Sequence, residues 1–176
     1  MKSSIRVGIL GTGEIAVPGM LEAAREVPEI AIVAVGSRSA VRAEEFAATH
    51  GIEHARTYDG HIADPLINAV YIVLPPSMHA KWSIRALDAG KHVLCEKPMC
   101  LNEIEARQVA AAVESSGRVF METFHYRHRP FMKRVRDLLN AKVWATLSEQ
   151  SLVCAFLLGT SRLMTFAASR PLAEER

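Results

Sequence analysis

The sequence has few cysteines, few aromatic residues and little net charge, and each shortage excludes a class of protein. Cys95, Cys100 and Cys154 show no CxxC spacing and cannot all pair within one chain, so we expect reduced thiols in a cytoplasmic protein. The formal net charge is only +2 and is spread along the chain, which does not favour nucleic acid or a membrane surface as a partner. No apolar run is long enough to span a membrane, and glycines interrupt the run that would have to form a signal peptide.

What is present is an aliphatic chain of moderate size. Hydrophobic residues make up 49% of the 176 residues and aromatic residues only 6%, so an ordinary aliphatic core can form. This length fits one domain with an appendage better than two complete domains.

Short apolar runs alternate with helical patterns along most of the chain. We expect strands at 5–10, 29–35, 54–57, 69–74, 92–95 and 119–122, and helices at 14–25, 40–50, 77–89, 102–116 and 130–140, with a further short helix ending at 64–65. Ser39 should cap the helix at 40–50 and Gly51 should end it, while 59–60 should form a turn. Three histidines are expected on the surface near turns: His50, His54 and His61. Strands that alternate with helices of this length predict an α/β fold with a doubly wound parallel sheet.

The first predicted strand runs into Gly11-Thr12-Gly13-Glu14-Ile15-Ala16, which matches the GxGxxA pattern of dinucleotide-binding Rossmann domains. The first glycine permits a tight turn, the second lets the main chain approach a diphosphate, and the alanine lets helix and strand pack closely. The helix start would then offer free N–H groups to the phosphates. Two alternatives stay open at this point: a glycine-rich turn of another α/β protein, and the glycine loop of a methyltransferase.

The residues after the second predicted strand indicate which nicotinamide dinucleotide would bind. NAD enzymes usually carry Asp or Glu there, bonded to the 2′-hydroxyl of the adenosine ribose. This chain has Gly36-Ser37-Arg38 instead, and a hydroxyl with a guanidinium would bind a 2′-phosphate well. We therefore expect NADP to be preferred over NAD. The alternative is that Arg38 is only a solvated arginine at a helix entry.

Several longer segments resemble the Gfo/Idh/MocA family, the group of glucose–fructose oxidoreductase, inositol dehydrogenase and rhizopine-catabolism proteins. They are DP at 64–65, NAVYI at 68–72, LPPSMH at 74–79, AGKHVLCEKP at 89–98 and METFHYR at 121–127, together with the glycine loop and Ser37-Arg38. The run at 89–98 is specific to the family. Together the segments look most like its branch of sugar and dihydrodiol dehydrogenases.

The resemblance implies an NAD(P)-dependent oxidoreductase that transfers a hydride between the nicotinamide and a hydroxyl-bearing carbon of a sugar, polyol or cyclic diol. Lys97 would be catalytic, because an amine beside the nicotinamide can donate to the substrate hydroxyl and stabilise the developing alkoxide; a solvent-facing loop lysine is the alternative. The cofactor would be bound by Gly11, Thr12, Gly13, Glu14, Ile15, Ser37, Arg38, Leu74, Pro75, Ser77, His79, Glu96, Lys97 and Pro98. Tyr126 and Arg127 would line the substrate site. Pro76 departs from the pattern, since many relatives carry asparagine or threonine there, which puts one side-chain hydrogen bond in doubt.

Glu122, His125 and His128 could also be read as metal ligands. Zinc ligands do occur at such short spacing, but no fourth ligand is evident and the strand-to-loop setting differs from HExxH on a helix. We therefore expect structural or substrate-lining roles for these residues and no metal.

The alternating pattern stops after residue 140. We expect a dinucleotide-binding domain at 1–125, a connecting helix at 126–140 that starts a substrate domain, and an atypical tail at 141–176. By the resemblance, the substrate domain would carry the histidine that takes the substrate proton and the contact through which full-length relatives form homo-oligomers. We interpret the tail as a remnant of that domain, truncated or read out of frame, and expect weak NADP binding and little turnover. The alternative is a non-catalytic dinucleotide-binding or regulatory protein.

Overall fold

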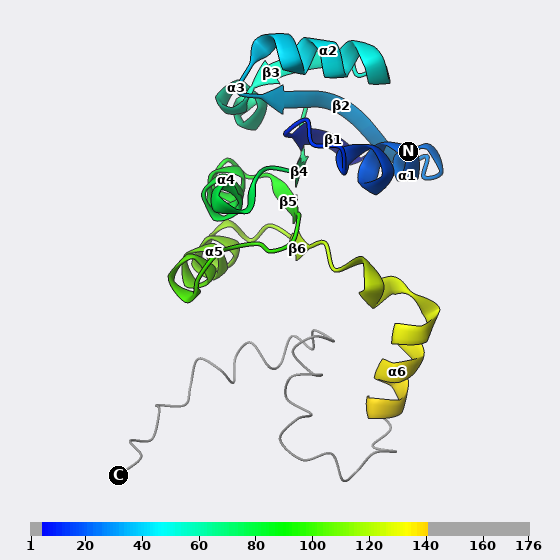
Figure 1. The fold of residues 1–176 in the computed structure, drawn as a ribbon. Coiled ribbons are helices and arrows are strands. Elements are labelled where there is room, and N and C mark those ends of the chain that lie inside the picture. Colours follow the sequence, from blue (N-terminus) through cyan, green and yellow to red (C-terminus); the bar gives the residue numbers. More distant parts are fainter. Residues whose placement is uncertain (1–4, 141–176) are drawn as a thin grey trace. The chain divides into compact units, whose positions relative to one another are not determined.

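The computed structural model describes residues 5–140, so the tail predicted at 141–176 lies outside the described residues. The chain divides into two compact units, Met1–Thr123 and Phe124–Arg176. The first unit carries the strands with their helices, and the described part of the second carries the two short helical segments that follow (Figure 1).

The first unit is built on a six-stranded parallel sheet with the order β3-β2-β1-β4-β5-β6. The strands are β1 (Ile5–Leu10), β2 (Ile30–Ser37), β3 (His54–Thr57), β4 (Ala69–Ile72), β5 (His92–Cys95) and β6 (Phe120–Glu122). The chain moves to one side of β1 for β2 and β3, then returns to place β4, β5 and β6 on the other side. This is the predicted doubly wound arrangement, and it makes a switch point between β1 and β4.

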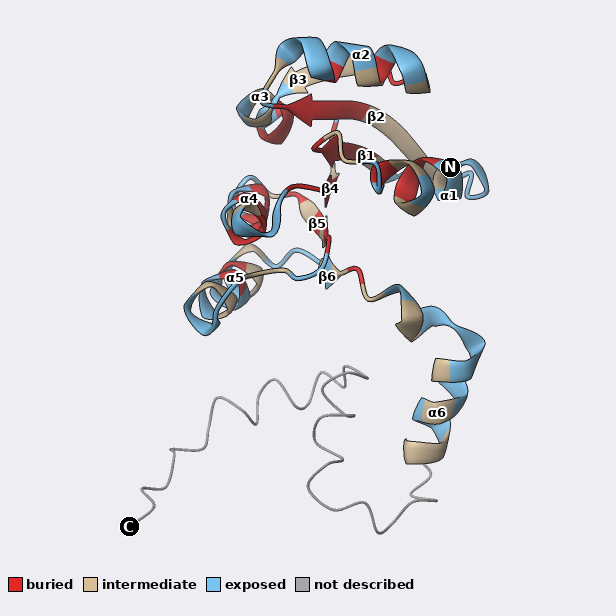
Figure 2. Ribbon diagram, viewed as in Figure 1, coloured by how far each residue is buried: buried red, intermediate tan, exposed pale blue. Residues whose placement is uncertain are grey.

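Helices cover both faces of the sheet and divide its core into two clusters. They are η1 (Val17–Leu21), a π-helix, and the α-helices α1 (Glu22–Arg25), α2 (Ala40–His50), α3 (Tyr58–Ala63), α4 (Pro76–Asp88) and α5 (Glu103–Ser116). Buried residues of η1 and α2 share a cluster with Val7 and Ile9 of β1, whereas those of α3, α4 and α5 share a cluster with Leu10. Burial is densest along the central strands, coloured red in Figure 2, because a parallel sheet covered on both faces has no solvated side.

Local capping signals decide where α2 and α5 begin and end. Ser39 Oγ accepts a hydrogen bond from Arg42 N at 3.4 Å, and Gly51 adopts the left-handed conformation with φ of 70°, so α2 has its predicted bounds. Asn102 Oδ1 accepts from Glu105 N at 2.9 Å and starts α5 in the same way.

The helix after the glycine loop begins later than predicted. We expected it near Glu14, but η1 begins at Val17. Pro18 has no N–H to bond back to the Glu14 carbonyl, so a regular α-helical start is not possible there. Tight turns replace it, with Ala16 N bonded to Gly13 O at 2.9 Å.

The turn expected at 59–60 is instead part of α3, because Thr57 Oγ1 caps that helix by accepting from Gly60 N at 3.2 Å. His61 follows in α3 and is fully buried, not on the surface as predicted. A Cβ at Gly8 would overlap the His61 ring, and one at Gly36 would lie 3.1 Å from it. Two glycines on adjacent strands therefore make the room that this imidazole occupies.

The described part of the second unit consists of η2 (His125–His128), a 3₁₀ turn, and α6 (Pro130–Asn140), which has the predicted bounds. The rings of Phe124 and Tyr126 lie 5.7 Å apart, centroid to centroid. Across residues 5–140, no helix combines the length and the apolar character needed to cross a membrane.

Protonation of His61 should make the fold sensitive to acid. Burial lowers the pKa of this histidine from 6.5 to about 4. The unfolded chain therefore takes up the proton first as the pH falls, so stability that is complete above pH 6.5 should decline towards pH 4 by up to about 3 kcal/mol. Urea unfolding at pH 7 and at pH 4.5 measures this loss.

His61→Leu should flatten the pH dependence, because it removes the titrating ring. His50→Leu is the matched control, since His50 is only half-buried and the variant retains His61. An acid loss as large in His61→Leu as in the unaltered chain would contradict the assignment.

Candidate functional site

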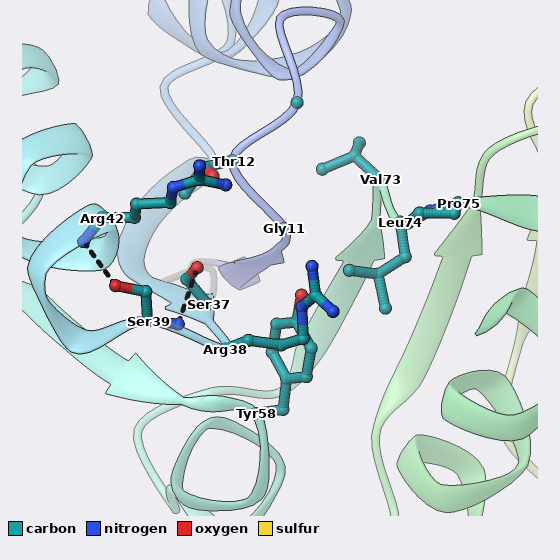
Figure 3. A pocket seen from close by; sticks show the side chains of 11 residues that line it. Gly11, Thr12, Ser37, Arg38, Ser39, Arg42, Tyr58, Val73, Leu74 and Pro75 are labelled. Carbon is teal, nitrogen blue, oxygen red and sulfur yellow. Dashed lines mark hydrogen bonds between the residues drawn. The ribbon is translucent and has the colours of Figure 1, made fainter.

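An open cleft of about 820 Å³ lies in the first unit, beyond the carboxyl ends of β1, β2 and β4 (Figure 3). It is lined by Gly11, Thr12, Gly13, Ser37, Arg38, Ser39, Arg42, Tyr58, Val73, Leu74 and Pro75. Because β1 and β4 are neighbours whose connections leave towards opposite sides of the sheet, the switch point opens into this cleft. Doubly wound sheets bind their ligands at that place.

The glycine loop after β1 forms one wall and lies directly against the end of β4. Gly11 has φ of 110°, and a Cβ there would lie 2.8 Å from the carbonyl oxygen of Val73. A Cβ at Gly13 would lie 3.3 Å from the same oxygen. Ala16, which completes the pattern, is fully buried. The two glycines and the alanine of the GxGxxA pattern are therefore required for the loop to pack closely against the end of β4 and the sheet, whether or not a ligand is bound.

Hydroxyl and guanidinium groups gather where β2 passes into α2. Ser37 and Arg38, both predicted cofactor residues, line the cleft, and so do Ser39 and Arg42. Ser39 N donates to Ser37 Oγ at 3.4 Å, and Arg42 N donates to Ser39 Oγ at the same distance. Within residues 5–140, no Asp or Glu lines this cleft. Such a donor set, without a carboxylate, suits an anion such as a phosphate monoester.

Sequence reasoning did not place four of the lining residues in the site: Ser39, which it named only as a helix cap, Arg42, Tyr58 and Val73. Arg42 stands in the first turn of α2, three residues after the cap Ser39, and side chains there tilt back towards the helix start. An arginine three residues after a predicted helix cap is the sequence pattern that could have predicted Arg42 as a site residue. Tyr58 is the first residue of α3, directly after β3. β3 lies near the cleft because it pairs with β2, and no local sequence pattern predicts that pairing.

Other predicted cofactor residues do not line this cleft: Glu14, Ile15, Ser77, His79, Glu96, Lys97 and Pro98. Glu14 and Ile15 are exposed directly after the glycine loop, and Lys97 and Pro98 are exposed directly after β5. Because all strands are parallel, the segments after β1 and β5 lie along the same edge of the sheet as the cleft.

The start of α4 differs from that of α2. Pro75 occupies the N-cap position and Pro76 the first helical position, so neither has an N–H to offer. No side chain caps this helix, and Ser77 is exposed in its first turn.

The loop at 96–99, which carries Lys97, is held by side chains from neighbouring strands. Tyr71 OH donates to Glu96 Oε1 at 2.6 Å, and Glu96 Oε2 accepts from Lys97 N at 3.3 Å. On the other side, Met99 N donates to Glu122 Oε1 at 2.9 Å. Burial raises the pKa of Tyr71, and the bond to Glu96 raises it further, so the phenol keeps the proton it donates.

His79 joins this loop to the wall of the cleft. Its Nδ1 lies 2.6 Å from the carbonyl oxygen of Pro98, and its Nε2 lies 2.6 Å from that of Leu74. The side chain is only 1% exposed. Leu74 lines the cleft, and Pro98 follows Lys97 through a cis peptide bond. The buried ring therefore contacts the main chain of both the loop at 96–99 and the cleft wall at Leu74.

Tyr126 and Arg127, predicted to line the substrate site, are half-buried in η2 of the second unit. Glu122, considered above as a metal ligand, engages the main chain of Met99. No group of three or more His, Cys, Asp or Glu side chains suited to a metal ion occurs in the part of the chain that the structure describes.

Known proteins match the part of the chain that builds this cleft. The family model GFO_IDH_MocA, described as an oxidoreductase family with an NAD-binding Rossmann fold, matches residues 5–124. A dTDP-3,4-didehydro-2,6-dideoxy-alpha-D-glucose 3-reductase of Saccharopolyspora spinosa is 37% identical over 141 residues, which are 80% of this chain and 42% of the reductase. A scyllo-inositol 2-dehydrogenase (NADP(+)) of Bacillus subtilis is 36% identical over 137 residues, 77% of this chain and 42% of the dehydrogenase. The chain therefore spans less than half the length of these relatives.

A solved structure matches over the same region. The crystal structure of KijD10, a 3-ketoreductase from Actinomadura kijaniata in complex with NADP, superposes with a TM-score of 0.71 at 36% identity. The match covers 80% of this chain and 45% of the ketoreductase. This agreement confirms the predicted Rossmann fold.

Tyr71→Phe should weaken the support beneath the loop at 96–99. The change removes the donor at 2.6 Å from Glu96, which is buried and cannot replace that bond with water, so we expect a loss of about 1–2 kcal/mol in urea unfolding. Tyr58→Phe is the control, since it deletes a hydroxyl at the half-exposed edge of the cleft. Equal losses in the two variants would show that the Tyr71–Glu96 bond has no special weight.

Proposed function

The chain belongs to the Gfo/Idh/MocA family of oxidoreductases, and on that premise we propose that it is the NADP-binding half of a dehydrogenase or reductase. The proposed reaction moves a hydride between the nicotinamide and a hydroxyl-bearing carbon of a sugar, polyol or cyclic diol. Relatives named for a sugar-nucleotide ketoreductase, a xylose dehydrogenase and an inositol dehydrogenase support this substrate class. We propose that residues 1–125 bind the dinucleotide and that 126–140 begin the substrate domain.

The observation that carries the proposal is the donor set of the cleft. Two hydroxyl groups and two guanidinium groups line the cleft where β2 passes into α2, those of Ser37, Ser39, Arg38 and Arg42. No carboxylate occurs among the described lining residues. These groups fit the 2′-phosphate of NADP, whereas an NAD site usually places a carboxylate at the end of β2. Gly11, Thr12 and Gly13 line the same cleft, so the main chain of the loop would lie against the diphosphate.

The bound nicotinamide would supply the hydride chemistry, and the chain's own residues would position the reactants. We assign Lys97 as the catalytic residue: its amine would hydrogen-bond the substrate oxygen and stabilise the alkoxide that develops while the hydride leaves. The hydroxyl proton would pass to the histidine that the resemblance places in the substrate domain, and the same histidine would return it in the reverse direction. Glu96 would hold the loop, since its carboxylate accepts from Tyr71 OH and from Lys97 N. Tyr126 and Arg127 would line the substrate entrance.

Replacing the arginines should separate NADPH binding from NADH binding. Arg38→Gln and Arg42→Gln each remove a charge-assisted bond to the 2′-phosphate, so the Kd for NADPH should rise about tenfold in each, with little change for NADH. Nicotinamide fluorescence titration measures both constants. Arg25→Gln, in the last turn of α1 and outside the cleft, should leave both unchanged. If the chain binds neither dinucleotide, or binds S-adenosylmethionine instead, the proposal is wrong.

Lys97→Met should abolish hydride transfer while leaving the Kd for NADPH within about twofold, because the amine acts on the substrate rather than on the phosphates. The assay follows nicotinamide absorbance with aldoses, polyols and dihydrodiols, and for the chimera described next also with the dTDP-linked keto sugar for which the Actinomadura kijaniata reductase is named. We expect slow turnover by the 176-residue chain, so the variant is also made in a chimera in which residues 5–124 replace the matching half of the Actinomadura kijaniata ketoreductase. An active chimera with Lys97→Met would overturn the assignment, and an inactive unaltered chimera that binds NADPH would favour a non-catalytic binding protein.

A further inference from the structure

We propose that His79 is a positioning residue that sets the distance between the cofactor cleft and the loop of Lys97. This inference rests on the proposed function, because it concerns how the cofactor cleft and the loop that carries Lys97 are held at a fixed distance from each other. It changes the role expected for His79, from a side chain that contacts the cofactor to one that acts through the main chain of Leu74 and Pro98.

The geometry of the ring supports this role. One nitrogen lies 2.6 Å from Leu74 O and the other 2.6 Å from Pro98 O, so the ring is in close polar contact with both carbonyl groups. Leu74 lies just beyond β4, and Pro98 lies just beyond β5, so a single imidazole spans the ends of two adjacent strands. Because the ring is 1% exposed, water cannot substitute for either bond.

The other two anchors of the loop act differently. Tyr71 holds Glu96 and Glu122 holds Met99, so each fixes the loop to the sheet. Of the three anchors, His79 is the one whose second bond reaches a residue that lines the cleft. Loss of the His79 side chain should therefore change the position of the loop at 96–99 relative to the cleft more than it changes the cleft or the loop alone.

His61 provides a matched comparison within the same fold. It is also a fully buried histidine on a helix, but it lies against Gly8 and Gly36 of β1 and β2 rather than at either segment that His79 joins. A general effect of losing a buried imidazole should appear in both variants, whereas a positioning effect should appear only at His79.

The test compares NADPH with 2′,5′-ADP, which contains the adenosine end of the dinucleotide but not the nicotinamide end. In His79→Leu we expect the Kd for NADPH to rise about tenfold and that for 2′,5′-ADP to stay within about twofold, because only the dinucleotide reaches both segments. Amide hydrogen exchange at Lys97 and Met99 should accelerate in the same variant. His79→Gln, which retains a single donor group, should restore part of the NADPH affinity. His61→Leu should leave the ratio of the two constants unchanged.

The ratio of the two dissociation constants is a readout that loss of packing alone would not change. An unchanged ratio in both His79→Leu and His79→Gln, or an equal shift of the ratio in His61→Leu, would overturn the inference. If the unaltered chain binds 2′,5′-ADP and NADPH but these effects are absent, only the role of His79 fails; if it binds neither ligand, the proposed function fails.

Discussion

The close approach of the glycine loop to the end of β4 is the constraint on which the rest of the site depends. Gly11 and Gly13 both face the carbonyl oxygen of Val73, and a methyl group at Gly11 would come within 2.8 Å of it. This contact brings the segment after β1 and the segment after β4 together at the switch point of the sheet. The cleft, its hydroxyl and guanidinium groups, and the segment that His79 reaches are all arranged around that junction.

Buried polar contacts with the main chain hold the edges of this arrangement in place. Lys91 Nζ donates to the carbonyl oxygens of Asp64 and Ile67 at 2.8 and 2.7 Å, which fixes the turn before β4 to the start of β5. His79 makes the corresponding link at the opposite ends of the same two strands. β4 and β5 are therefore tied together at both ends by side chains as well as by their ladder of hydrogen bonds. Each of these bonds therefore gives a main-chain carbonyl group outside the ladder a side-chain partner.

The sequence predicts well what is decided locally and poorly what is decided across the sheet. The strands, the bounds of α2 and the GxGxxA turn follow from apolar runs, a serine cap and glycines, all of which act within a few residues. The burial of His61 could not be predicted in this way, because it depends on Gly8 and Gly36, which lie on two other strands. Arg42 was within reach through the Ser39 cap, whereas Tyr58 and the Tyr71–Glu96 bond arise only when strands pair. The late start of η1 follows from Pro18, which has no N–H to bond back to the Glu14 carbonyl.

The pair of prolines at the start of α4 has a consequence for the direction in which an elongated anion can lie. A helix start normally attracts negative charge through its free N–H groups, but Pro75 and Pro76 remove two of them at the β4 end of the cleft. The hydrogen-bond donors that the structure offers to an anion therefore lie on the β1 and β2 side, where the glycine loop and two arginines line the cleft. The uneven supply of amide hydrogens thus gives the cleft a polarity, which favours one orientation of a long ligand that is charged at one end.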